Sequence, residues 1–482
     1  MPHLQGTARE AVIQFPPTLD EYVRPDNPVR FIDAFVDQLD LVALGFERAV
    51  ANPLGRPAYA PGDLLKLYLY GYLNRVRSSR LLEREARRNV EVMWLLKKLT
   101  PDFKTIADFR KDNHARFKSV FRAFTLLCRQ LDLFGGELVA VDGSKFKAVN
   151  NQDRNFTKPK LQRLLAETEA QISGYLQQLE QQDQADGAVL PPPLSAEQLQ
   201  AKIEHLQQRQ ERYQALATAL EQSGQTQISL TDPDSRSMPK SPKVPVGYNV
   251  QVAVDAKHHL MVEQEVTNAV NDQNQLSPMA LAAQAALGVE TLEVVADKGY
   301  YDGEQVKDCA DHGLTCFIAK PLTSVNIKRG LFSKEDFRYD HEKDCYHCPA
   351  NQELRFHFET TEAGRRIRYY WTTACRTCPL RPRCTRDAER RRISRWVHED
   401  ILEAMQERVA AHPEKMKQRK MMVEHPFGTL KHWWDQSHFL LRGLKKVCGE
   451  FSLSALAYNL RRVFNIVGVP GLLEALKSQK SA

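Results

Sequence analysis

Between residues 247 and 319 the sequence alternates short β-rich runs with helical segments. Strand character is present at 247–256, 260–267, 291–297 and 314–319, and helical character at 274–287 and 303–313. Two leading strands followed by alternating helices and strands are typical of an α/β sheet. An earlier β-rich run, GGELVAVDGSK, is predicted to end as a strand at Asp142, with Gly143 turning the chain. We therefore expect the fold class to be α/β.

The rest of the chain differs in character from this sheet pattern. Residues 158–225 are rich in Gln, Glu and Leu, with two leucine stripes separated by three prolines at 191–193, which predicts an antiparallel helical hairpin. The predicted organisation is a helical domain at 1–130, an α/β domain at 135–320 and 398–470, the inserted hairpin at 158–225, and a cysteine- and arginine-rich insertion at 321–396.

Charge is concentrated in one segment of the chain. The net charge is +7, but residues 365–395 alone hold eleven arginines, no lysine and two acids. Such a concentration favours a polyanionic partner, with Arg390, Arg391 and Arg392 as candidate contacts, although a solvated loop has the same composition. The sequence lacks a signal peptide and a long apolar run, so we expect a cytoplasmic protein.

A second basic stretch lies in the amino-terminal helices. Residues 61–89 have apolar residues at helical spacing, interrupted near Arg77 to Ser79, and carry several arginines that include Arg84 and Arg88. A helix-turn-helix unit that binds DNA and a plain helical bundle both fit this pattern.

Five of the nine cysteines cluster between residues 345 and 384. They form two Cys-x-x-Cys pairs and one further cysteine: Cys345, Cys348, Cys375, Cys378 and Cys384. Four thiolates of this kind can surround a structural zinc ion and leave no open position for catalysis. The fifth cysteine leaves the ligand set open, and reduced structural thiols are the alternative.

Two aspartates follow the predicted strands of the α/β domain. Asp142 and Asp297 each come at the end of an apolar run, where functional groups gather in open α/β sheets. Glu424 lies in a basic helical segment and is a third candidate. Carboxylates from separate elements can hold two Mg²⁺ (or Mn²⁺) ions for phosphoryl transfer. Rival acids are Asp255, at the end of its own strand, and the loop residues Asp232 and Asp234.

These blocks resemble a known family. VAVDGSK, VVADKGYYD and VEHPFGTLKHW, in this order, are similar to the catalytic blocks of DDE transposases from bacterial insertion sequences. PDFKTIADFRKDN at 101–113 resembles the branch with an amino-terminal helical domain. The resemblance implies an RNase H-like catalytic domain, with Asp142, Asp297 and Glu424 as the catalytic metal ligands.

Related transposases carry a Tyr-Arg-Glu-Lys signature around the glutamate. The corresponding positions here are Lys417, Lys420, Glu424 and Lys431, so only the last two match. Pro426 predicts a kink or a fresh helix start between them. Lys298, Lys420 and Lys431 are expected to steady DNA phosphates.

Together, these observations predict a transposase that cuts the ends of a mobile element and joins the 3′-OH to target DNA. Its partners would be double-stranded DNA, both terminal repeats and target, and further copies of itself in a synaptic complex at the nucleoid. Two alternatives remain: a degenerate DNA-binding protein that occupies the element ends, and a metal-dependent nuclease without strand transfer.

Overall fold

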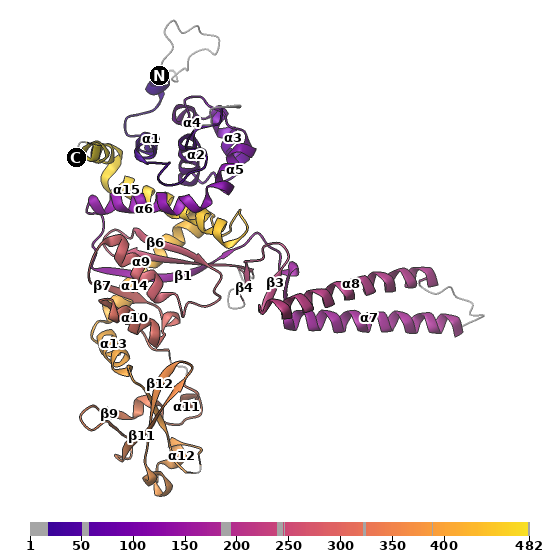
Figure 1. The fold of residues 1–482 in the computed structure, drawn as a ribbon, viewed down its shortest axis with the longest axis vertical. Helices are drawn as coiled ribbons and strands as arrows, with labels where there is room; N and C mark the ends of the chain where they lie inside the picture. The colour runs from indigo at the N-terminus through magenta and orange to yellow at the C-terminus, as the bar shows by residue number, and fades with distance from the viewer. Residues whose placement is uncertain are drawn as a thin grey trace, which may run out of the picture.

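The computed structural model describes residues 18–50, 57–184, 194–238, 244, 246–321, 324–387 and 389–480. The molecule is elongated (Figure 1), with amino-terminal helices at one end, a mixed sheet in the middle and a second, small sheet at the other end. A pair of long helices projects sideways from the central sheet. The proline triplet predicted to break the hairpin lies outside the described residues.

The central sheet has the strand order β6-β5-β1-β7-β8, with short β4 (Arg236–Ser237) also paired to β5. β1, β7 and β8 are mutually parallel, whereas β5 runs antiparallel to β1 and β6. Their bounds are β1 Leu138–Lys147, β5 Val246–Asp255, β6 Met261–Thr267, β7 Leu292–Ala296 and β8 Leu314–Ile318. The strands predicted between 247 and 319 are therefore confirmed.

The prediction that the first strand ends at Asp142 is wrong. β1 continues through Gly143 to Lys147 because its antiparallel pairing with β5 continues, from Val139 opposite Asp255 to Lys147 opposite Gly247. Gly143 therefore lies within a strand and does not turn the chain. The residues after Asp142 are mainly polar, so the local sequence did not indicate that the strand continues. The sequence also does not show that a second strand lies alongside.

Helices cover both faces of the central sheet. α9 (Leu276–Leu287) packs against β1, β5, β6 and β7, and α10 (Gly303–Asp311) packs against α9 and β8. α14 (Pro413–Gly428) packs against β1, β5 and β7, and α13 (Glu399–Ala411) lies between α14 and β8. Because strand side chains alternate, Asp142 faces α14 while Gly143 faces the side of α9.

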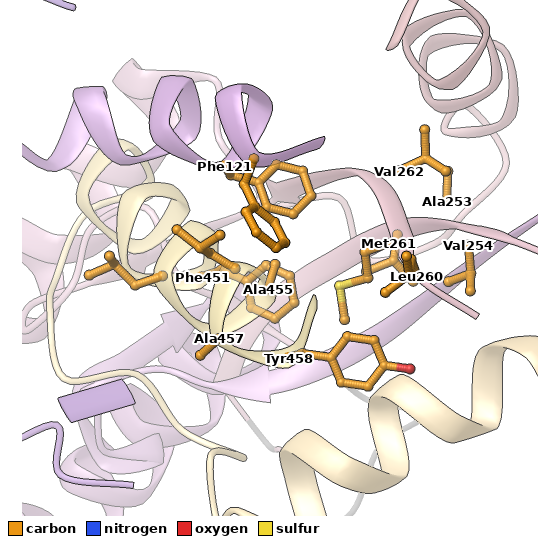
Figure 2. Packing of buried hydrophobic residues seen from close by; sticks show 14 of the residues in the cluster. Phe121, Ala253, Val254, Leu260, Met261, Val262, Phe451, Ala455, Ala457 and Tyr458 are labelled. Carbon is orange, nitrogen blue, oxygen red and sulfur yellow. The ribbon is translucent and has the colours of Figure 1, made fainter. Parts of the chain in front are cut away.

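The carboxyl-terminal helix joins the sheet to the amino-terminal helices. α15 (Leu444–Lys480), interrupted at Gly468, packs against β6 and against α1, α2 and α6. Figure 2 shows this junction, where Phe121 of α6, Phe451 and Tyr458 of α15, and Met261 of β6 come together. The amino-terminal helices are α1 Pro28–Gln38, α2 Pro61–Leu73, α3 Ser79–Arg88, α4 Val90–Leu95, α5 Phe103–Asp112 and α6 Phe117–Gln130. One continuous hydrophobic core therefore runs from these helices into the sheet.

The projecting pair consists of α7 (Lys158–Gln184) and α8 (Ala196–Ser223), which pack side by side. A small cluster that includes Phe156, Leu161 and Leu220 closes its base, beside the two-stranded pair β2 (Asn155–Thr157) and β3 (Gln227–Ser229). The predicted helices are confirmed. No helix in the described parts of the chain, these long ones included, has the length and apolar character needed to cross a membrane.

The cysteine- and arginine-rich insertion forms its own antiparallel sheet in the order β13-β12-β11-β10-β9. Its strands are β9 Arg338–Asp340, β10 Cys345–His347, β11 Glu353–Glu362, β12 Arg365–Trp371 and β13 Ile393–Trp396, with short helices α11 Val325–Lys328 and α12 Arg381–Cys384. Its separate core contains only five fully buried apolar residues, which are Phe337, Tyr346, Leu354, Tyr370 and Ile393. We call residues 324–396 the cysteine unit.

Candidate active site

Asp142 and Asp297 lie side by side at the centre of the sheet. β1 and β7 are parallel neighbours, with Val141 paired to Ala296, and each aspartate is the next residue along its strand. Neighbouring strands lie about 4.8 Å apart, and residues in register on parallel strands point to the same face. The fold therefore brings together two carboxylates that are far apart in the sequence.

Burial is the largest influence on the Asp142 carboxyl. The pKa of Asp142 is raised to about 6, mainly by burial, and the carboxylates of Asp297 and Asp272 act in the same direction. Two contacts act in the opposite direction: the Arg419 guanidinium lies 3.5 Å from Asp142 Oδ2, and the Gly143 N–H donates to Oδ1 at 2.8 Å. Asp142 is thus a partly buried anion held between one cation and two acids.

Asp297 caps the short 3₁₀ turn Lys298–Tyr300 that follows β7. Its Oδ1 accepts a hydrogen bond from the Gly299 N–H at 2.7 Å, which leaves Oδ2 without a role in the turn. This turn explains why an aspartate stands at the end of β7. The Asp297 side chain stabilises the turn and remains partly exposed.

Glu424 approaches the same site from α14. It lines, together with Asp142, a cavity of about 850 Å³ between β1 and α14. Its side chain is 64% exposed and lies 3.7 Å from the Lys420 ammonium. Asp297 is not among the residues lining this cavity, although it stands beside Asp142 in the sheet.

The prediction of a fresh helix start at Pro426 is wrong, whereas a kink there stays a prediction. α14 continues through Pro426 to Gly428 and then passes directly into a π-helical turn, Thr429–Trp433. Proline lacks an N–H and its ring crowds the carbonyl four residues earlier, and the irregular turn follows directly. As a result Lys431 and Glu424 line the same cavity.

Lys431 forms the basic side of the cavity. Its ammonium donates to Ser144 Oγ at 2.6 Å and to the Lys145 carbonyl at 2.7 Å, and lies 4.5 Å from the centre of the Phe146 ring. Burial lowers the pKa of Lys431 to about 8, with the nearby Lys145 ammonium acting in the same direction. Lys145, Lys147 and His432 also line this side of the cavity.

A polar network on the opposite face of the sheet supports Gly143. Asp272 accepts hydrogen bonds from Asn249 Nδ2 at 2.6 Å and from Gln251 Nε2 at 2.8 Å, and Tyr300 donates to Gln251 Oε1. A methyl group at Gly143 would lie 2.3 Å from Gln251 Nε2 and 2.7 Å from Asp272 Oδ1. The glycine is therefore required by close packing within a strand.

The rival acids have structural roles. Asp255 is fully buried and accepts from the N–H groups of Gly135, Gly136 and Lys257. Asp232 accepts from Tyr248 Oη at 2.7 Å and from the Gly443 N–H at 3.0 Å. The Asp234 carboxylate accepts from the Leu444 N–H at 2.8 Å. Each of these carboxylates holds a loop in place, and none of them lines the cavity.

The predicted phosphate contacts are spread over the molecule. Lys298 and Lys420 are exposed and flank Asp297 and Glu424, respectively. Arg84 and Arg88 are exposed on α3, where Arg88 is paired with Glu85. These two arginines lie in the amino-terminal helices and not at the cavity.

Many arginines of the cysteine unit are engaged within the protein. Arg366 and Arg368 pair with Glu359, and Arg395 is buried against Glu403. Arg390 and Arg392 lie over the Trp371 ring, at 4.8 and 5.6 Å from its centre. Arg391 donates to the Phe332 carbonyl at 3.4 Å and lies over Phe337. Of the predicted triplet, only Arg392 is exposed.

The five clustered cysteines separate into two places. Cys348, Cys375, Cys378 and Cys384 line one small cavity of about 20 Å³. Cys345 lies apart, with its Sγ 3.9 Å from His347 Nε2 and within 4.8 Å of an Asp340 oxygen.

Arg419 and Asp272 are the residues at the site that sequence reasoning missed. Arg419 stands one residue before the position at which the family signature has its arginine, and Asp272 lies in an ordinary polar loop before α9. For Arg419, the only signal in the sequence was its place next to the signature position. No feature of the sequence indicated that Asp272 lies at the site.

Two families match the chain. Residues 17–112 match a family described as Transposase domain (DUF772), and residues 347–464 match one described as Transposase DDE domain. The second match includes Glu424, while Asp142 and Asp297 precede it. No curated protein matches the chain. Among solved structures, a piggyBac transposase synaptic complex with hairpin DNA is similar at 9% identity and a TM-score of 0.33, covering 95% of this chain and 80% of that one. A similarity of this size carries no argument about this chain.

The chain therefore carries an amino-terminal transposase domain followed by a carboxyl-terminal transposase DDE domain. This confirms the resemblance to DDE transposases that its sequence blocks indicate.

Proposed function

We propose that this transposase cleaves the ends of an insertion sequence and joins the freed 3′-OH to target DNA, with Asp142, Asp297 and Glu424 as the catalytic acids. One observation carries the proposal: Asp142 stands in register beside Asp297 and shares a cavity with Glu424. Antiparallel β5 and β6 beside three parallel strands also support an RNase H-like core for the catalytic domain.

The donor set fits two Mg²⁺ or Mn²⁺ ions. All three side chains offer carboxylate oxygens, the hard ligands that these ions prefer. Asp142, although partly buried, already has a cation beside it in the Arg419 guanidinium, as expected for an anion that needs a counter-charge. When bound, two such ions would activate the attacking oxygen and stabilise the leaving oxygen of a phosphodiester.

The remaining residues bind and orient DNA. The Lys431 ammonium stands at the cavity, where it would contact phosphate oxygens next to the scissile bond, whereas the Lys145 ammonium lies 3.4 Å from Asp272 Oδ1. In the first step a water oxygen bonds to phosphorus and the P–O3′ bond breaks; the water proton goes to solvent, and the departing 3′ oxygen takes up a proton. In the second step that 3′-OH oxygen bonds to a target phosphorus, and the target strand's own 3′ oxygen leaves.

This chemistry sets the partners. The substrate is double-stranded DNA, both the terminal repeats and the target, and the reaction would take place at the nucleoid in the cytoplasm. Since two ends must be cut and joined together, we propose that the chain acts as a homo-oligomer in a synaptic complex.

The test is to incubate the protein with Mg²⁺ and DNA carrying its element's terminal repeats, and to follow binding, nicking and joining separately. Asp142→Asn, Asp297→Asn and Glu424→Gln should each abolish nicking while DNA binding persists. Glu414→Gln, an exposed change near the start of α14, is the matched control and should leave nicking unchanged. Nicking without joined products would indicate a nuclease without strand transfer. Binding without any nicking by the unaltered protein would indicate a degenerate DNA-binding protein.

A further inference from the structure

The cysteine unit is built with little hydrophobic support. Its core has five fully buried residues, its two helices are four residues long, and the chain from Thr372 to Arg392 contains no strand among its described residues. Units this small need a disulfide, a metal ion or another staple to remain folded. The described residues contain no disulfide.

Four thiols lie in the irregular part of this unit. Cys348 follows β10, Cys375 lies within the 3₁₀ turn Thr373–Thr377, Cys378 follows that turn, and Cys384 ends α12. All four line one cavity of about 20 Å³, which is room for a single water-sized sphere. The remaining lining is mainly apolar, including Phe332, Leu354 and Leu380.

Two groups that suit thiolates border this cavity. The Gln352 N–H donates to Cys348 Sγ at 3.3 Å, and the turn that allows this bond places Asn351 at a φ of 55°. The Arg391 side chain lines the same cavity. Four thiolates in so small a space would persist only with a cation among them.

The fifth cysteine faces away from this cavity. Strand side chains alternate, so Cys345 and His347 point to one face of β10, while Tyr346 points into the core against which Cys348 and Cys384 pack. Cys345 instead forms a group with Asp340 and His347, whose ligand atoms lie within 4.8 Å of one another. Asp340 and His347 already contact each other in this group, with His347 Nε2 3.6 Å from Asp340 Oδ2.

We infer that Cys348, Cys375, Cys378 and Cys384 bind one structural zinc ion, and that Cys345 is not a ligand. Four thiolates and no open position define a structural site. The ion would tie the turn after β10 to the segment that contains α12, and so fix the loop that carries Arg390, Arg391 and Arg392.

Metal analysis of the purified, reduced full-length chain tests the inference. We expect about one zinc per chain in the unaltered protein and in Cys345→Ser, and a loss of most of the zinc in Cys384→Ser. Replacement of zinc by Co²⁺ should give the absorption bands of a tetrahedral tetrathiolate in the first two proteins. Zinc lost from Cys345→Ser but kept in Cys384→Ser would overturn the ligand set in favour of Asp340, Cys345 and His347.

A second measurement does not depend on any variant folding. Removing the metal from the unaltered protein with a chelator should increase the alkylation rate of the four proposed ligands, mapped by mass spectrometry, and zinc added back should protect these four again. Increased alkylation of Cys345 alone, or a freshly prepared protein that contains no zinc, would refute the inference. None of these measurements requires transposition, so their outcome does not depend on whether the proposed function is correct.

Discussion

The Arg419–Asp142 pair allows a quantitative test of the site. The two charged groups lie 3.5 Å apart, with 18% and 23% of their side chains exposed. A neighbouring cation favours the ionised carboxylate, so Arg419→Gln should raise the pKa of Asp142 further above its value of about 6. Asp142 would then hold its proton over more of the neutral pH range.

Coulomb's law sets the size of the effect. At 3.5 Å the attraction is about 1.2 kcal/mol in bulk water and about 4.7 kcal/mol at an effective dielectric constant of about 20. Because both side chains retain contact with water, we expect the lower part of this range, about 1.4–2.7 kcal/mol. This corresponds to a rise of about one to two units in the pKa of Asp142.

The assay is Mn²⁺ affinity, measured by electron paramagnetic resonance between pH 5 and 9. Metal binding requires the carboxylate, so affinity should fall as the pH drops through about 6 in the unaltered protein and through about 7 to 8 in Arg419→Gln. At pH values above both midpoints, Arg419→Gln should bind Mn²⁺ at least as tightly as the unaltered protein, because the Arg419 cation no longer competes with the metal. Lys417→Gln removes the same charge from an exposed position of α14 and should leave the midpoint unchanged. An identical midpoint in Arg419→Gln and the unaltered protein would refute the reasoning.

Three further predictions concern other parts of the chain. Gly143→Ala should lower the free energy of unfolding by about 1–3 kcal/mol in urea denaturation, because its methyl group would collide with Gln251, whereas Gly174→Ala in the open middle of α7 should raise it slightly. Cleavage should decline above about pH 8, where the Lys431 ammonium loses its proton, and Lys431→Met should lack this alkaline decline in its pH–rate profile. Arg392→Ala should reduce by about one the slope of log DNA affinity against log salt, and an unchanged slope would place this arginine outside the DNA contact.

The last two strands of the sheet were predictable because they are short and mainly apolar. β7 and β8 are runs bounded by turn residues, and their pattern indicates both their type and their approximate limits. β1 was predicted too short because its last part, Gly143 to Lys147, is polar and lies at the cavity. Partner strands outside the local sequence hold such a segment extended, so local pattern alone does not define its end.

The meeting of two candidate acids was predictable for a different reason. Asp142 follows the apolar half of β1 and Asp297 follows β7, and the parallel pairing of these two strands brings the two positions side by side. Arg419 could not be assigned in this way, because its importance comes only from packing α14 across β1. In the arginine-rich segment the sequence suggested more than the structure has. The charge density favoured a free basic surface, but Glu359 and Glu403 pair with several of these arginines. Both glutamates lie outside the run of arginines with which they pair, so the local sequence did not indicate the pairing.

The cavity has the same charge order along both elements that form it. On β1 an acid, Asp142, is followed by Lys145 and Lys147; on α14 and its π turn an acid, Glu424, is followed by Lys431. Lys431 reaches β1, since its ammonium donates to the Lys145 carbonyl at 2.7 Å, while the Lys145 ammonium itself lies 3.4 Å from Asp272 Oδ1. Cations are therefore favoured at one end of the cavity and phosphate oxygens at the other, an arrangement suited to a phosphodiester bridging the two. The continuity of α14 through Pro426 makes this possible, because a helix restarted there would no longer fix Lys431 relative to Glu424.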